Sequence, residues 1–281
     1  MISADDAPFV ILAPSHSTGL LLKEFEALDD ALAALPGAGV EARPLPWEDL
    51  PLPAFVGEAS RLPLMVTGWP GGVIPEGDVA AGEILHELST APDIMETGDL
   101  EEALRLAVEG AGVAAEWRRI TEAESVERLL KNDAAIGWSG FDVISRDEAL
   151  RARLERRRMT VDHFRGRIDW TVLRGHDLLS GAILLEKALS AEMVPAEVAA
   201  RWQARIAGEM LLRFDSWRAL ARSALLGALW TGLEESEKAG AERMRRAAAA
   251  LQQLLGDEGA WTRFPWPRQL PDAEPPAVYG F

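Results

Sequence analysis

Hydrophobic and polar positions follow different patterns in the two halves of the chain. In the first half, short apolar runs alternate with helical patterns, beginning with a run at residues 9–13 and a helical pattern at residues 20–35. Further runs predict strands at residues 40–45, 62–67, 113–120 and 134–138, and helices at residues 77–88, 100–109 and 122–131. Strands that alternate with helices are typical of a parallel sheet. The first half is therefore predicted to be an α/β unit, a mostly parallel sheet covered by helices.

Beyond residue 145 the apolar positions fall at helical spacing. Helices are predicted at residues 178–189 and 241–255. The clearest stripe runs over about five turns and consists of Val198, Trp202, Ile206, Met210, Phe214 and Trp217. Large aromatic side chains at this spacing favour core packing, and lining a ligand cavity is the alternative. We expect an all-α helical bundle in this half.

Proline use supports a boundary at the same place. Eleven of the 17 prolines precede Arg146, one follows at Pro195, and five lie in the last 21 residues. We therefore predict an acidic α/β domain at residues 1–145, an α-helical domain at residues 146–260 and an extended proline and aromatic tail at residues 261–281. The tail either straps across its own domain or, through exposed rings such as Trp261 and Trp266, marks an interaction site.

Charge is divided in the same way. Residues 1–100 contain 17 acidic and three basic residues, a net charge of −14 out of −16 for the chain. This acidity disfavours nucleic-acid binding. Residues 146–174 instead contain nine arginines and five acids, including the run Arg156, Arg157 and Arg158. The run is either a solvated helix face or a dock for the acidic first hundred residues, within the chain or across an oligomer interface.

Composition limits the classes of site and location. The chain has no cysteine, which excludes disulfides, thiolate nucleophiles and cysteine-ligated zinc. Its first residues lack the basic flank and apolar run of a secretory signal, and no apolar stretch approaches the ~18 residues needed to span a bilayer. We expect a cytoplasmic protein without a membrane span.

The polar loop Ser15, His16, Ser17, Thr18 and Gly19 is the best candidate for a ligand-binding site. It lies between the first predicted strand and the first predicted helix. Loops at the carboxyl ends of strands meet helix N-termini, whose free N–H groups suit an anion or a reacting oxygen. The alternative is a turn in which Ser17 or Thr18 caps the helix and His16 has no special role.

Residues 8–90 resemble one lobe of the small class II tetrapyrrole chelatases. The resemblance is carried by residues 10–13, His16 with Ser17, and residues 24–28, 40–41 and 64–66. That family places a metal-binding histidine directly after its first strand, so the resemblance implies that His16 holds a divalent metal over a porphyrin-like ring. Gly71 and Gly72 stand in the glycine-rich turn, with Val73 in place of the family's second histidine.

Two further patterns concern a cleft and a second metal ligand. Residues 99–150 resemble one lobe of the polar amino-acid type of solute-binding protein, which implies a sheet with a cleft. Glu83 and His86 share a helix face, so His86 is a second candidate metal ligand, although a di-metal site needs more carboxylates than this pair supplies. His163 and His176 lack the spacing of metal ligands.

These patterns predict a cytoplasmic, non-catalytic binding or accessory protein that acts through an α/β cleft and a helical interaction domain. We expect a protein partner or self-association, and a small molecule is a further candidate ligand. One alternative is a chelatase-like or degenerate enzyme that binds a divalent metal and a tetrapyrrole, with His16 as metal ligand or general base. The other is a small-molecule sensor whose interdomain cleft is lined by Trp202, Trp217 or Trp230.

Overall fold

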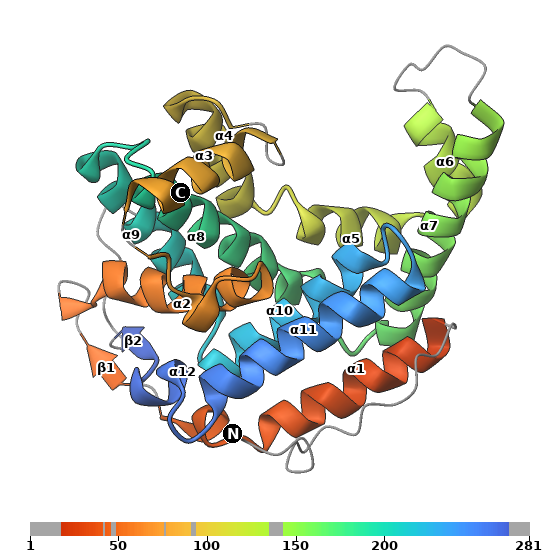
Figure 1. Cartoon of the computed structure of the whole chain (residues 1–281). Helices are drawn as coiled ribbons and strands as arrows, with labels where there is room; N and C mark the ends of the chain where they lie inside the picture. The colour runs from red at the N-terminus through yellow and green to blue at the C-terminus, as the bar shows by residue number, and fades with distance from the viewer. Residues whose placement is uncertain are drawn as a thin grey trace.

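The computed structural model describes residues 18–41, 43–45, 49–75, 77–90, 94–134 and 143–269, and most of these residues are helical (Figure 1). The α-helices are α1 (Thr18–Ala33), α2 (Leu52–Val66), α3 (Asp78–Thr90), α4 (Thr97–Glu109), α5 (Val113–Glu122), α6 (Val126–Ala134), α7 (Val143–Phe164), α8 (Arg174–Ser190), α9 (Ala196–Arg213), α10 (Trp217–Gly232), α11 (Glu237–Leu255) and α12 (Ala260–Arg263). Short 3-10 helices among the described residues are η2 (Pro36–Gly39), η4 (Pro70–Gly72) and η5 (Trp170–Leu173).

Helix α10 lies at the centre of the fold. It packs along α11, against α8 and against α1, and most of its residues are buried. Its approach to α11 requires glycine, because a Cβ atom added to Gly232 would lie 2.5 Å from the Cα atom of Gly240. Residues 145 and 146, at the predicted domain boundary, both lie inside α7, and one continuous core contains buried residues from both sides of them.

The α/β prediction for the first half is wrong. Residues 62–66 form the end of α2, and residues 113–120 belong to α5. Within the described ranges, the only strands are β1 (Arg43–Leu45) and β2 (Pro267–Gln269), which pair in parallel. A short apolar run fits a buried helix as well as a strand. In α5 the buried residues Ala114, Trp117 and Ile120 are three apart, which is helical spacing.

Without the predicted parallel sheet, both family resemblances are wrong. A class II chelatase lobe and a solute-binding-protein lobe are each built on a parallel sheet. Residues 24–28 and 64–66 of the first resemblance are helical and residues 40–41 belong to no helix or strand, while residues 99–134 and 143–150 of the second lie in helices and the turns between them. The α/β cleft in the predicted function is therefore wrong as well. The predicted strand at residues 9–13, and residues 135–138 of the last predicted strand, lie outside the described residues.

The helical half agrees with its pattern except at one point. The predicted helices at residues 178–189 and 241–255 lie within α8 and α11. The long stripe is interrupted, because α9 ends at Arg213, Phe214 is extended, and α10 begins at Trp217. Ser216 caps α10 by accepting a hydrogen bond from the backbone N–H of Ala219 at 3.2 Å. The chain therefore turns where a continuous helix was expected.

Acidic residues of α1 pair with basic residues of the second half. The carboxylate of Glu24 accepts two hydrogen bonds from Arg245, at 2.5 and 2.9 Å. Glu26 accepts from Arg167 at 2.8 Å and lies 3.1 Å from the ring of His163. The uneven distribution of charge along the sequence thus contributes to the attachment of α1, together with its buried apolar face.

The aromatic residues at the start of the tail are buried in the core. The ring of Trp261 stacks on Trp217 with centroids 4.5 Å apart, and its indole N–H donates to the carbonyl of Glu58 at 2.8 Å. Trp266 meets both Trp217 and Phe55 edge to face, with centroids 4.9 Å apart in each case. These contacts fix the chain up to β2 against α2 and α10. Among the described residues, no helix is long and apolar enough to cross a membrane.

Candidate ligand pocket

Of the predicted binding loop at residues 15–19, only Thr18 and Gly19 lie among the described residues. Ser15, His16 and Ser17 lie outside the described residues. The role of His16 as a metal ligand or general base therefore stays a prediction. Thr18 begins α1, and both its backbone N–H and its hydroxyl donate to Oε1 of Glu237, at 3.0 and 2.5 Å. Its side chain therefore links α1 to the first turn of α11. A Cβ atom at Gly19 would meet no other atom within 4 Å.

The glycine turn has a structural explanation. Gly71 and Gly72 have φ angles of 64° and 67°, in the left-handed region that favours glycine. A Cβ atom on Gly72 would lie 2.4 Å from the carbonyl oxygen of Arg61, so the turn packs directly on α2. His86 is exposed on α3, and the described part of the chain holds no group of three or more His, Asp or Glu side chains that could bind a metal ion.

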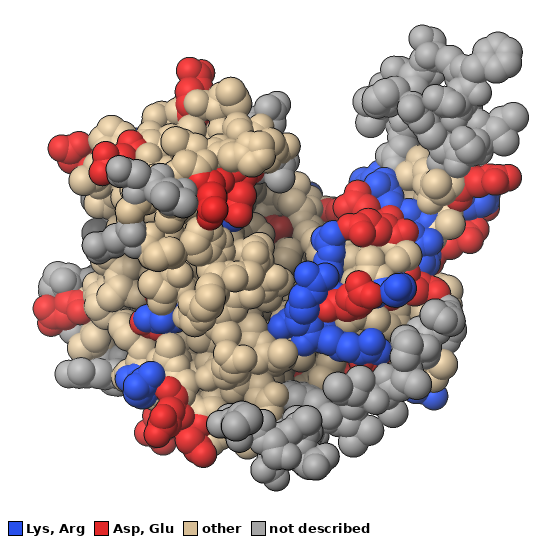
Figure 2. Space-filling view, in the orientation of Figure 1, with Lys and Arg blue, Asp and Glu red and all other residues tan. Residues whose placement is uncertain are grey.

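The arginine run makes contacts within the chain. The guanidinium of Arg156 donates to the carbonyl of Leu233 at 3.0 Å, at the end of α10, and that of Arg158 donates to two carbonyls at the end of α5. Arg157 is 3% exposed, pairs with Glu116 and lies over the ring of Trp230. Cations are favourable at helix C-termini, so the run attaches α7 to α5 and α10. Figure 2 shows basic and acidic side chains interleaved on the side of the molecule that carries α5, α7 and α11.

A buried carboxylate joins α8 to α5. Asp177 accepts hydrogen bonds from the backbone N–H groups of Val113 and Ala114, at 2.8 and 3.1 Å, and so caps α5. A Cβ atom at Gly112 would lie 2.6 Å from the Asp177 carboxylate, so glycine is required there. Burial raises the pKa of Asp177 to about 6, although the two backbone hydrogen bonds and Arg174 oppose the shift.

A chain of charged side chains connects this junction to the surface. Arg174 is buried, donates to the carbonyl of Val108 and lies 3.2 Å from Glu209. Burial lowers its pKa. Glu209 also accepts from Arg213 at 2.7 Å, and Arg213 reaches the surface at the end of α9.

His176 lies beside this cluster but takes no part in it. Its ring fills the space that a Cβ atom on Gly227 would occupy, and burial lowers its pKa to about 4. The ring is therefore neutral at neutral pH. His163 instead pairs with Glu26, as described above.

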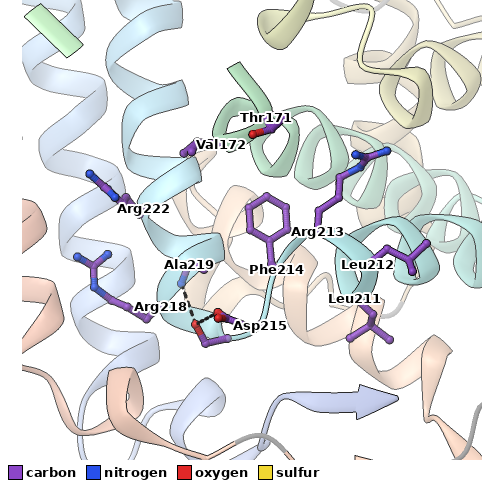
Figure 3. A pocket seen from close by; sticks show the side chains of 11 residues that line it. Thr171, Val172, Leu211, Leu212, Arg213, Phe214, Asp215, Arg218, Ala219 and Arg222 are labelled. Carbon is purple, nitrogen blue, oxygen red and sulfur yellow. Dashed lines mark hydrogen bonds between the residues drawn. The ribbon is translucent and has the colours of Figure 1, made fainter. Parts of the chain in front are cut away.

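The turn between α9 and α10 opens a cavity of about 820 Å³ (Figure 3). Its walls come from η5, the end of α9 and the first turns of α10. The lining residues are Thr171, Val172, Leu211, Leu212, Arg213, Phe214, Asp215, Ser216, Arg218, Ala219 and Arg222. Figure 3 shows Phe214 at the centre of this ring, Arg218 and Arg222 along one edge and Arg213 on the opposite side.

The cavity combines an apolar surface with donors of hydrogen bonds. Val172, Leu211, Leu212 and Phe214 supply the apolar part. Within the described chain, the backbone N–H groups of the first two residues of α10 have no acceptor. The N-terminus of α10, the positive end of its dipole, thus lies at the cavity wall beside Ser216, whose hydroxyl donates to Asp215 at 2.9 Å.

The arginine edge is paired in charge but poorly satisfied in hydrogen bonding. Nη2 of Arg218 lies 2.5 Å from Oδ1 of Asp29 on α1, and Nε of Arg222 lies 3.1 Å from Oδ2. Neither contact has the alignment of a hydrogen bond. Asp29 Oδ1, Arg218 Nη1 and Arg222 Nε are all buried without a hydrogen-bond partner. Buried polar atoms are normally hydrogen-bonded, so the contact between Asp29 and the two arginines leaves part of their hydrogen-bonding capacity unused.

Residues 83–266, well over half of the chain, match the family described as "Protein of unknown function (DUF1266)". The chain belongs to this family. The match is to neither of the families that the sequence resembled. Every residue that lines the cavity lies inside the matched segment, whereas Asp29 and the rest of α1 precede it. No curated protein and no solved structure matches the chain.

The sequence pattern did not predict this cavity, because Phe214 and Trp217 continue the helical spacing of the residues before them and so predict one unbroken helix. The available signal was Asp215 with Ser216, a pair of N-cap residues directly before a new apolar run. The meeting of Asp29 with α10 has no local signal, since nearly 190 residues separate the partners.

Proposed function

We propose that the protein is a cytoplasmic, non-catalytic binding protein, and that the cavity between η5, the α9–α10 turn and α10 holds a small anionic molecule with an apolar body. The observation that carries this proposal is the arginine edge. Arg218 and Arg222 both line the cavity, and one buried nitrogen atom of each lacks a hydrogen-bond partner, while Val172, Leu211, Leu212 and Phe214 supply apolar surface.

The chemistry of the lining residues favours an anion. Guanidinium groups match the geometry of carboxylate and phosphate oxygens, and a helix N-terminus stabilises negative charge. The volume of about 820 Å³ lies within the usual range of ligand pockets. The apolar body of the ligand would contact Phe214 and Leu212, and its anionic group would reach Arg222, whose side chain is 41% exposed.

The same residues argue for binding rather than reaction. No histidine is among the lining residues, and the one hydroxyl near the arginine edge, that of Ser216, is used to cap α10. The one basic group in contact with the Ser216 hydroxyl is the carboxylate of Asp215, at 2.9 Å, and no histidine lines the cavity to activate a serine nucleophile. The ligand is therefore held and released unchanged.

Titration calorimetry with phenyl phosphate tests the proposal. The wild-type chain should bind phenyl phosphate more tightly than inorganic phosphate, because only the former fills the apolar surface. Arg222→Gln should weaken binding at least about tenfold, the effect of losing one charge-assisted hydrogen bond. Arg246→Gln is the matched control, since Arg246 is exposed on α11 and does not line the cavity.

Two results would contradict the proposal. The first is no binding of phenyl phosphate by the wild-type chain. The second is equal affinity of the wild type, Arg222→Gln and Arg246→Gln, which would place any binding elsewhere on the surface.

The proposal includes an accessory role with a protein partner or self-association. It is supported by three exposed apolar side chains between η4 and the start of α4, namely Val73, Leu85 and Met95. Figure 2 shows a mostly uncharged face over α2 as well, with acidic side chains on the part of the molecule that carries α3 and α4. Light scattering should give a mass above the 30.6 kDa of one chain, or a co-purifying protein. A monomer that purifies alone would contradict this part of the proposal.

A further inference from the structure

We infer that Asp29 determines the affinity of the anion site by competing with the ligand for Arg218 and Arg222. This inference rests on the proposed function and identifies a residue outside the walls of the cavity. Asp29 is supplied by α1, its side chain is only 12% exposed, and it contacts both arginines of the edge.

The contact is favourable in charge and poor in geometry. Six buried side-chain atoms in the described chain lack a hydrogen-bond partner, and three of them belong to Asp29, Arg218 and Arg222. A carboxylate can accept several hydrogen bonds and each guanidinium can donate five, and one buried atom of each of these three side chains is without a partner. A ligand with freely positioned oxygens can align with the same guanidinium groups better than Asp29 does.

Release of the Asp29 carboxylate does not require movement of α1. Nη2 of Arg218 also donates to the backbone carbonyl of Asp29 at 2.8 Å, a contact that is independent of the carboxylate. The helix is further held by the buried side chains of Leu21 and Phe25 and by the pair between Glu24 and Arg245. Rotation of one side chain is therefore enough to transfer the arginines to a ligand.

The electrostatic consequence is a weaker site. The two positive charges of the edge are opposed by one carboxylate in direct contact, and Arg213 on the opposite side is opposed by Glu209. An incoming anion must displace Asp29 or share the arginines with it, and two anions on one site repel each other. Asp29 thus keeps binding of an anionic ligand readily reversible.

The test compares phenyl phosphate affinity in full-length variants by calorimetry. Asp29→Asn should bind at least about tenfold more tightly than the wild type, because the competing charge is gone. Asp29→Glu retains the charge and should stay within about twofold of the wild type. Asp30→Asn is the matched control, since Asp30 is the next residue of α1, is exposed and removes the same charge.

The outcomes separate this inference from the proposed function. If the wild type binds and Arg222→Gln weakens binding, but Asp29→Asn equals the wild type or Asp30→Asn, the inference is wrong and the proposed function stands. If neither the wild type nor Asp29→Asn binds, the proposed function is wrong and the inference falls with it.

A second measurement applies if Asp29→Asn does not fold, as judged by circular dichroism. The carboxyl carbon resonance of Asp29 in the wild type can be assigned by its loss in Asp29→Glu. Addition of phenyl phosphate should shift this resonance by changing the partners of the carboxylate. A resonance that stays in place while phenyl phosphate binds would overturn the inference.

Discussion

The close contact between α10 and α11 makes the most specific prediction. Gly232 of α10 faces the backbone of α11, and a Cβ atom added there would lie 2.5 Å from Cα and 2.6 Å from N of Gly240. Both are backbone atoms, so no side-chain rotation can relieve the clash, and the helices must separate. Overpacking of this kind costs about 1–3 kcal/mol, and the higher helix propensity of alanine returns no more than about 1 kcal/mol. Gly232→Ala should therefore lower the free energy of unfolding by about 1–2 kcal/mol.

The same substitution at Gly82 is the control. Gly82 is exposed on α3, and a Cβ atom there would meet nothing within 4 Å. Gly82→Ala should raise the free energy of unfolding by up to about 1 kcal/mol through helix propensity alone. Urea unfolding followed by circular dichroism measures both variants. The reasoning would be refuted if Gly232→Ala were as stable as Gly82→Ala, because α10 and α11 would then not approach so closely.

Two further predictions concern buried polar groups. Burial raises the pKa of Asp177 from 3.8 to about 6, so the folded protein binds a proton that the unfolded chain has released. The free energy of unfolding of the wild type should therefore fall by up to about 3 kcal/mol between pH 4 and pH 7. Asp177→Asn should lack that fall. Parallel pH profiles of the two proteins in urea unfolding would contradict this prediction. Arg156→Ala should lower the melting temperature, because it leaves the carbonyl of Leu233 without its donor. Arg105→Ala, which breaks only exposed ion pairs with Glu102 and Glu109, should change it little, and an equal effect of both would contradict the capping role.

Long periodic segments were predictable from the sequence, and short apolar runs were not. The segment that became α11 has apolar positions at helical spacing over five turns, so only a helix buries them on one side. Residues 62–67 gave no such evidence, and Pro63 argued against a helix although it lies inside α2. Residues 113–120 did carry helical spacing, at Trp117 and Ile120, and the strand prediction there used the wrong period.

The cavity was less predictable than the helices because it depends on tertiary contacts. Ser216 marks the start of α10 locally, but only packing brings Val172 of η5 and Asp29 of α1 to the same place. The loop around His16 is a predicted binding site because a helix N-terminus beside polar residues suits an anion. The same physical argument applies at the start of α10, where the described structure places arginines as well.

The central claim is that this cavity binds an anion, and a crystal structure of the chain with saturating phenyl phosphate tests it most directly. The account predicts the phosphate group within hydrogen-bonding distance of Arg222 or Arg218 and the phenyl ring against Phe214. Phenyl phosphate bound away from these residues, or an unchanged cavity at a concentration that saturates binding in solution, would contradict it.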